Sequence, residues 1–303
     1  MRVHHLNCGT MCPPFGRLVN GTGSLFARGR MVCHCLLVEG ADGLALVDTG
    51  LGTADVADPC GRLGAGFARM MGAPFSRDET ALAQVEKLGF RREDVRHLLP
   101  THLDLDHAGG LSDFPDATVH LLAREHDAAT GRRTWRERER YRPMQLAHKP
   151  KWRLLETGGG DRWFGFESVR AVGGTKDEIL LVPLLGHTRG HSGVAVRTEG
   201  GWILHAGDAY FFHGEVHEDP PRCPPLLAGF QSLVEVDREA RLGNQARLRE
   251  LASDHGREVT IVSAHCPIEL ERALAATPAA APATHAASST NGTKVTNGSA
   301  LVH

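Results

Sequence analysis

Short apolar runs bounded by Gly, Pro, Asn or Asp recur along this chain and have the length of β-strands. They predict strands at residues 3–11, 31–39, 44–47, 95–99, 117–122, 179–185 and 259–262. A longer apolar stretch at 193–204 is interrupted by Glu199, Gly200 and Gly201, and this interruption predicts the turn of a β-hairpin.

Three segments carry helical signals. Ser76 and Glu79 have the spacing of a capping box, which predicts a helix from there to about residue 88. Residues 124–130 predict a short helix, and residues 237–255 predict an amphipathic helix. The strands and helices together predict the α/β fold class.

The segments between these elements differ in composition. Residues 50–75 form a Gly/Ala-rich connection, and residues 134–158 form an insertion rich in Arg, Trp and Lys that we expect at the entrance of a pocket. Residues 276–303 are rich in Ala, Pro, Thr, Ser and Asn, which predicts a disordered tail after a single domain over residues 1–275.

The charge balance excludes some classes of partner. The net charge is −2 and the pI is about 6.8, so nothing directs the chain to nucleic acid or to an anionic membrane surface. The alternating charges of residues 136–140 predict a solvated helix face with local ion pairs. A small-molecule substrate is therefore the expected partner, and apolar residues at 226–234 hint at a homodimer.

The seven cysteines form no zinc-ribbon spacing, and reduced, buried thiols are the default expectation for them. Residues 1–30 contain no apolar core of a secretory signal, and no apolar run is long enough to span a membrane. These features predict a cytoplasmic protein.

Four residues of metal-ligand type fall within six positions, directly after the strand predicted at 95–99: His102, Asp104, Asp106 and His107. Imidazole and carboxylate together suit Zn²⁺, Fe or Mn better than Ca²⁺ or Mg²⁺. Downstream, further ligand-type residues follow predicted strands, namely His187, His191, Asp208 and His265. Asp48 follows the strand at 44–47 in the same way.

In this order, the segments resemble the metallo-β-lactamase superfamily, over about residues 31–270. The resemblance implies a four-layer αββα sandwich with two divalent metal ions, zinc or else Fe or Mn, at one edge. It implies ligands at His102, Asp104, Asp106, His107, His191, Asp208 and His265, with Asp208 between the two metals. Asp104 departs from the family, which usually has His there, so a mononuclear site stays open as an alternative.

The same resemblance suggests roles for other residues. Asp106 is a candidate ligand that orients a metal-bridging hydroxide and passes a proton to the leaving group. Tyr210, close after Asp208 as in lactonases of the superfamily, is a candidate donor to a substrate oxygen. His187 and Asp48 are expected to support the ligands without binding metal.

The resemblance predicts a metal-dependent hydrolase of a lactone or other ester. A thioester hydrolase similar to glyoxalase II and an iron-dependent oxidoreductase of the same fold are the alternatives. A nuclease of this fold would need a basic arm that the charge balance does not provide. A non-catalytic scaffold is disfavoured by the nearly complete ligand set.

Overall fold

The computed structural model describes residues 1–159, 162–172 and 178–276. The disordered tail predicted for residues 276–303 lies, except for its first residue, outside this range. No helix among the described residues is long and apolar enough to cross a membrane.

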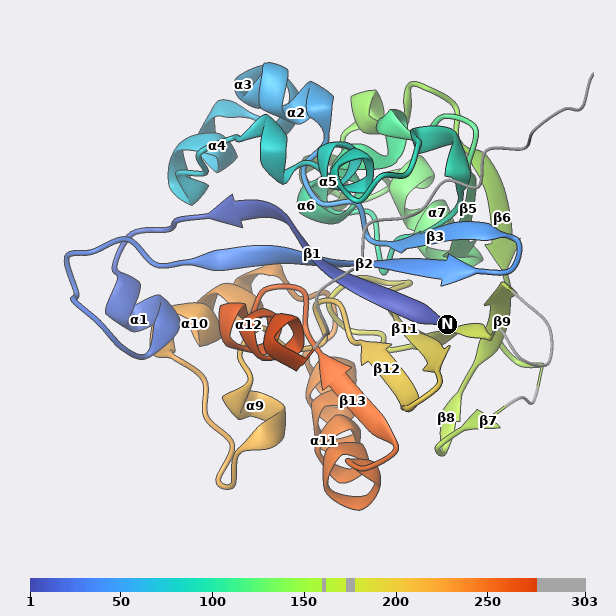
Figure 1. The fold of residues 1–303 in the computed structure, drawn as a ribbon. Coiled ribbons are helices and arrows are strands. Elements are labelled where there is room, and N and C mark those ends of the chain that lie inside the picture. Colours follow the sequence, from blue (N-terminus) through green and yellow to red (C-terminus); the bar gives the residue numbers. More distant parts are fainter. Residues whose placement is uncertain (160–161, 173–177, 277–303) are drawn as a thin grey trace, which may run out of the picture.

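Two β-sheets form the centre of the molecule (Figure 1). The first sheet has the strand order β1 (Arg2–Met11), β2 (Met31–Gly40), β3 (Gly43–Val47), β4 (Val95–Leu99), β5 (Thr118–Leu122) and β6 (Lys151–Leu155). The second has the order β13 (Val259–Val262), β12 (Gly201–His205), β11 (Ser192–Thr198), β10 (Ile179–Pro183) and β9 (Val169–Val172). Strands β3 to β6 run parallel to one another, and so do β12 and β13. The other pairs within these two sheets are antiparallel. A separate hairpin joins β7 (Arg162–Trp163) and β8 (Phe166–Glu167).

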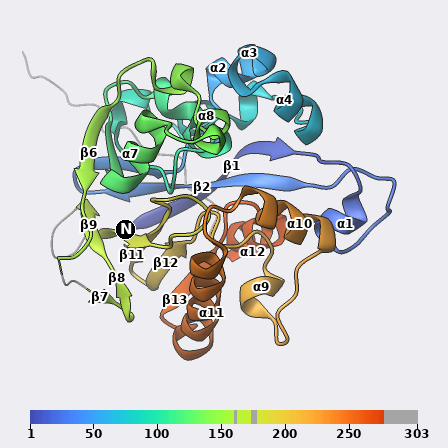
Figure 2. The same ribbon diagram turned by 180° about the vertical axis from the view of Figure 1, so that it is seen from behind.

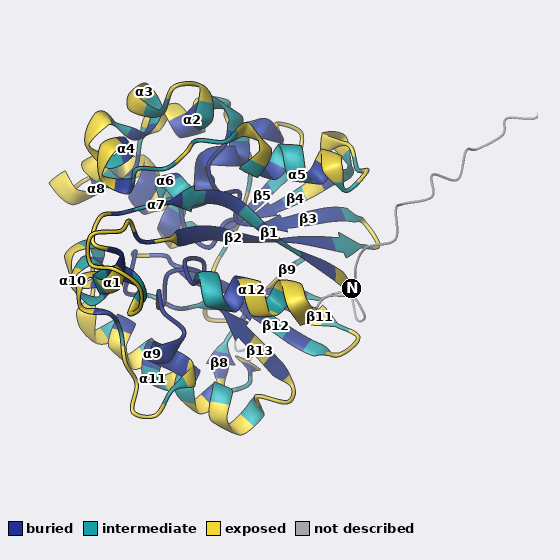
Figure 3. Ribbon diagram, turned by 60° about the vertical axis from the view of Figure 1, so that its left-hand side comes forward, coloured by how far each residue is buried: buried dark blue, intermediate teal, exposed yellow. Residues whose placement is uncertain are grey.

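Helices lie outside both sheets (Figures 1 and 3). On the side of the first sheet are α2 (Thr53–Ala57), α3 (Pro59–Leu63), α4 (Ala65–Met71), α5 (Ala81–Lys87), α6 (Leu105–Ala108), α7 (Ala123–Gly131) and α8 (Trp135–Arg140). The remaining helices are α1 (Gly16–Asn20), α9 (Gly214–His217), α10 (Pro225–Val234), α11 (Arg238–His255) and α12 (Pro267–Ala276). In Figure 3 the strands are mostly buried, whereas the outer faces of the helices are exposed.

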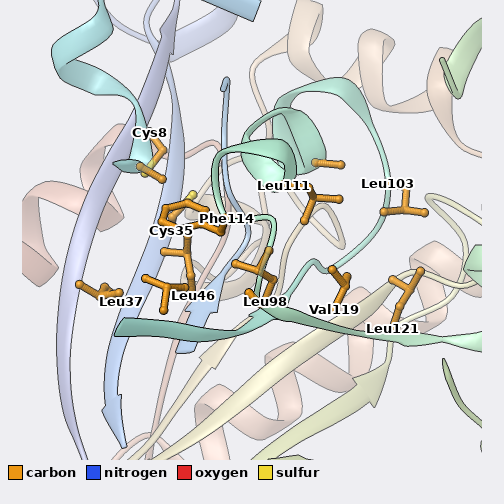
Figure 4. Packing of buried hydrophobic residues seen from close by; sticks show 14 of the residues in the cluster. Cys8, Cys35, Leu37, Leu46, Leu98, Leu103, Leu111, Phe114, Val119 and Leu121 are labelled. Carbon is orange, nitrogen blue, oxygen red and sulfur yellow. The ribbon is translucent and has the colours of Figure 1, made fainter. Parts of the chain in front are cut away.

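The side chains of β2 explain this layered arrangement. Successive side chains of a strand point to opposite faces of its sheet. Leu37 packs toward the outer helices, in a cluster with Leu46 and Leu98 (Figure 4), whereas Leu36 and Val38 pack against the second sheet. Both faces of β2 are therefore buried, as expected for a strand inside a sandwich.

The second sheet is covered in the same way, because Leu204 and Ile261 share a cluster with Leu248 and Leu251 of α11. The predicted four-layer αββα sandwich of the α/β class is thus confirmed. One predicted boundary was wrong. Residues 77–79 form only a short 3₁₀ turn, and helix α5 begins after Thr80, whose hydroxyl accepts a hydrogen bond from the Ala83 amide.

A buried histidine pair in the first sheet leads to a pH-dependence prediction. The His97 and His120 rings meet at 3.0 Å between Nδ1 and Nε2, near Asp42 and Arg153. Burial, His97 and Arg153 lower the pKa of His120 to about 4. The unfolded chain therefore takes up a proton below pH 6.5 that the folded protein rejects. We expect the free energy of unfolding to fall by up to about 3 kcal/mol between pH 6.5 and 4 from this residue.

Urea denaturation at several pH values would test this expectation. The pH slope of the free energy of unfolding should be shallower in the His120→Gln variant than in the wild type. An unchanged slope in His120→Gln would contradict the assignment.

Candidate metal centre

The first part of the site forms where β3 and β4 end. Asp48 has a left-handed backbone with φ of 54°, and its carboxylate accepts hydrogen bonds from the Thr101 amide at 2.7 Å and from the Thr101 hydroxyl. Its Oδ2 atom lies 2.9 Å from Nδ1 of His107. Such a bond fixes the ring and directs Nε2 of His107 into the site. Asp48 thus occupies the supporting position expected for it.

His265, Asp106 and Asp208 complete one half of the centre. His265 donates from Nδ1 to the carbonyl of Val32 at 2.8 Å, which directs its Nε2 to within 3.3 Å of Nε2 of His107. Asp208 Oδ1 lies 3.1 Å from the His265 Nε2 and 3.3 Å from the His107 Nε2. Asp106 Oδ2 lies 3.5 Å from the same His265 atom.

The other half contains His102, Asp104 and His187. Asp104 Oδ2 lies 3.3 Å from Nε2 of His102 and 3.1 Å from Nε2 of His187. Asp208 turns its second oxygen to this half, 3.3 Å from the His187 Nε2 and 3.8 Å from the His102 Nε2. Asp208 therefore faces both halves with one oxygen each, as expected for a ligand between two ions.

His191, predicted as a ligand, lies beside His102, with the two ring centroids 5.1 Å apart. Its Nδ1 lies 2.8 Å from the carbonyl of Leu184, and its Nε2 accepts a hydrogen bond from the Asp208 amide at 2.9 Å. Both ring nitrogens are thus occupied by backbone groups, and His191 supports the Asp208 loop. His187, expected only as a supporting residue, points its Nε2 toward Asp104 and Asp208.

The chemistry of the cluster fits a pair of divalent metal ions. Three buried atoms of the cluster have no hydrogen-bond partner among the described residues: His102 Nε2, Asp104 Oδ1 and Asp208 Oδ1. Unpaired buried polar atoms are costly, and metal ligation would satisfy those that face the centre. Mixed imidazole and carboxylate donors suit zinc, iron or manganese. Two trios, His102–Asp104–His187 and Asp106–His107–His265, could each hold an ion, and a third group, His102–His107–Asp208, overlaps both.

Two carboxylates of the cluster, Asp104 and Asp208, are held in the ionised form that a metal requires. Burial alone would raise the pKa of Asp208, but His265, His107 and His187 outweigh it and hold this pKa well below its usual value. Burial opposes ionisation of Asp104 too. The charges of Arg140 and His102 outweigh this effect and keep the pKa of Asp104 well below its usual value.

Tyr210 lies away from the site, so the prediction that it donates to a substrate oxygen was wrong. Its side chain is fully buried beside α11 and β13, and its hydroxyl donates to Glu269 at 2.8 Å. The next residue, Phe211, lines the pocket in its place, packing against the His265 ring.

A Tyr210→Phe variant should therefore retain turnover within about twofold. It should be less stable by roughly 1–3 kcal/mol, because the buried Glu269 loses a donor. Chemical denaturation and steady-state kinetics would measure the two effects separately. A tenfold loss of kcat in a folded variant would restore the catalytic role.

Three buried carboxylates fasten the four ligand loops, a feature that the sequence did not reveal. Glu125 of α7 accepts from the amides of Leu103 and Gly190, each at 3.0 Å, and thereby joins the His102 and His187 loops. Glu215 accepts from the Phe211 and Phe212 amides. Glu269 accepts from the amide and hydroxyl of Ser263, two residues before His265.

An apolar pocket of about 600 Å³ opens directly onto the centre, with Asp104, Asp106 and Asp208 among its lining residues. The side of the first sheet contributes walls from α4 and α8, and α10 contributes the opposite wall; Figure 2 labels these helices. Apolar side chains dominate these walls, namely Met11, Met31, Phe67, Met70, Met71, Trp135, Phe211, Phe230 and Leu233. The inserted segment at 134–158 shapes this pocket through α8 and Tyr141, as predicted.

Arg140 also belongs to the site, although the sequence did not predict this. It ends the alternating run at 136–140, for which a solvated helix face was predicted, yet its side chain is mostly buried. Its guanidinium donates to the carbonyls of His187, at 2.8 Å, and of Val234, and Nε lies 3.4 Å from Asp104 Oδ1.

Comparison with known proteins agrees with this geometry. The model of the metallo-beta-lactamase superfamily matches residues 28–254. A probable metallo-hydrolase of Mycobacterium tuberculosis is 43% identical over 268 residues, which cover 88% of this chain and 81% of the relative. The chain belongs to the metallo-β-lactamase superfamily. It is a metallo-hydrolase of this superfamily.

More distant members are similar to the chain as well. An N-acyl homoserine lactonase of Bacillus cereus is 27% identical over 219 residues, covering 72% of this chain and 75% of that one. Among solved structures, an N-acyl homoserine lactone hydrolase with N-hexanoyl-L-homoserine at its catalytic metal center has a TM-score of 0.66 at 20% identity, covering 89% of this chain and 95% of that one. A dizinc quorum-quenching lactonase has a TM-score of 0.56 at 16% identity, covering 88% and 87%. At these identities the structures show the shared fold.

Proposed function

We propose that this superfamily member hydrolyses a lactone or another carboxylic ester with an apolar substituent, using two divalent ions, preferably zinc. The observation that carries the proposal is the pair of ligand trios with Asp208 between them, at the floor of an apolar pocket. His102, Asp104 and His187 would hold one ion, and Asp106, His107 and His265 the other. When bound, such a pair supplies a hydroxide nucleophile at neutral pH and polarises the ester carbonyl.

The chain's own residues account for the remaining steps. Ester hydrolysis breaks the bond between the carbonyl carbon and the leaving oxygen, and that oxygen must gain a proton. Asp106 lines the pocket with 13% of its side chain exposed, so its carboxylate is placed to hold a proton and pass it to the leaving group. The side chain of Tyr210 takes no part in this account.

The pocket walls favour an apolar substrate portion. Phe211 and Phe230 pack against each other beside the centre, and methionines of β1, β2 and α4 line the same space. Methionine side chains adapt to irregular apolar groups, which suits acyl chains of different length. The named activity of the lactonase relatives agrees with a lactone, and the N-hexanoyl product named for one structure carries such a chain.

Hydrolysis assays on metal-loaded protein would test the proposal. Zinc-, manganese- and iron-loaded samples would be offered lactones and linear esters with acyl chains of four to twelve carbons (about the length range that a 600 Å³ pocket can hold), alongside matched thioesters. We expect hydrolysis of lactones or esters that improves with chain length. A strong preference for thioesters, or no hydrolysis by any metal-loaded form, would contradict the proposal.

A further inference from the structure

Asp104 and Arg140 form an ion pair at the point where this chain departs from the superfamily motif. The motif usually has a neutral histidine at position 104, and the aspartate adds one negative charge to the centre. Arg140 Nε lies 3.4 Å from Asp104 Oδ1, with 16% and 18% of the two side chains exposed. The other oxygen, Oδ2, faces His102 and His187.

The two oxygens of Asp104 therefore have different surroundings. Oδ2 points to His102 and His187. Among the residues that the structure describes, Oδ1 has no hydrogen-bond partner, and the guanidinium of Arg140 is the charge beside it. Arg140 is also fixed in place, because it donates to the His187 carbonyl and to the Val234 carbonyl at the end of α10. It cannot swing away without breaking contacts to two walls of the site.

We propose that Asp104 and Arg140 act as one unit that replaces the usual histidine. Asp104 supplies one oxygen ligand to the first metal position, and Arg140 neutralises the additional charge. The unit keeps the net charge of the centre equal to that of a centre with histidine at this position. Arg140 is a positioning residue in this account, because it acts through Asp104 and the His187 backbone. The inference rests on the proposed metal centre and deepens it.

The ion pair between Asp104 and Arg140 predicts the stability of each single variant. In the metal-free protein, Arg140→Gln leaves the Asp104 carboxylate without its counter-ion, and Asp104→His leaves the mostly buried guanidinium without one. Removing one partner of a buried ion pair is strongly destabilising. We expect each single variant to lower the Tm of the metal-free protein by roughly 5 °C or more. The Tm loss of the double variant should be at most half of the sum of the two single losses.

Metal affinity provides the second readout. In Asp104→His, an uncompensated arginine lies beside the first metal position, so affinity for one zinc ion should fall about 10- to 100-fold. Adding Arg140→Gln to that variant should raise this affinity again by about tenfold. The contacts of Arg140 with the His187 and Val234 carbonyls are lost in both backgrounds, so they cancel in the double-mutant cycle.

The experiment is a double-mutant cycle on the full chain, read by Tm without metal and by zinc affinity in competition with a chelator. Arg136→Gln is the matched control, because Arg136 lies on the same helix and lines the same pocket, and the acceptor of its hydrogen bond is the carbonyl of Glu235. Arg136→Gln should change the Tm and the zinc affinity by the same amount whether residue 104 is Asp or His. If the effects of the two changes were additive in both Tm and zinc affinity, Asp104 and Arg140 would not act as one unit. The proposed hydrolase function would be unaffected by that result. A wild-type protein that binds no divalent metal would overturn both.

Discussion

Replacement of Asp208 by alanine should remove metal from both halves of the centre and lower kcat/KM by roughly 10³- to 10⁴-fold. Among the described carboxylates of the cluster, only Asp208 turns one oxygen to each ligand trio. Its Oδ1 lies 3.1 Å from the His265 Nε2, and its Oδ2 lies 3.3 Å from the His187 Nε2. Losing it removes a shared ligand and leaves clustered imidazoles without the anion between them.

Elemental analysis and hydrolysis rates, measured on the same samples, would check this expectation. Asp208→Asn is the matched control for shape, since it retains the side-chain volume and loses only the charge. We expect it to lose metal as well, because a neutral amide is a weak ligand for divalent ions. Two retained metals and nearly normal turnover in the asparagine variant would show that Asp208 is not shared between the two metals.

Of the single variants considered, Glu125→Ala should lower the free energy of unfolding most, by about 3–5 kcal/mol in the metal-free protein. Four donors converge on this fully buried carboxylate: the Leu103 amide, the Gly190 amide, the Thr188 hydroxyl and the Tyr141 hydroxyl. Alanine would leave the two amides buried without acceptors, and unsatisfied buried groups carry the full cost of desolvation. The loops carrying His102 and His187 would both lose their common anchor.

Denaturation of the metal-free protein in urea would measure this loss. Glu125→Gln keeps one acceptor oxygen and should cost less than the alanine variant, and Tyr141→Phe removes only one donor and should cost less again. If Glu125→Ala lowered the free energy of unfolding by less than about 1 kcal/mol, the anchoring role would be wrong.

The ligand-bearing segments could be predicted because the same pattern repeats, a short apolar strand followed directly by His or Asp. The difference between the predicted and the observed arrangement lies inside one loop, at His187 and His191. His187 and His191 are four residues apart, and both follow β10. His187 lies nearer to the carboxyl end of that strand, whereas His191 directly precedes β11, so the rule that located the other ligands favours His187.

Other parts of the site depend on contacts that no local pattern encodes. Tyr210 and Phe211 are adjacent and both buried, and only the three-dimensional packing decides that the phenol meets Glu269 and the phenyl ring meets the pocket. Arg140 belongs to a charge-alternating helix. Its role depends on the distance to Asp104, which is 36 positions earlier in the sequence.

Metal content per chain, measured together for the wild type, His187→Ala and His191→Ala, tests the central claim most directly. His187 Nε2 points into the cluster, whereas both ring nitrogens of His191 face backbone groups. We therefore expect about two divalent ions in the wild type, about one in His187→Ala and about two in a folded His191→Ala. Loss of one ion in His191→Ala with both retained in His187→Ala, or a wild type without metal, would contradict the account.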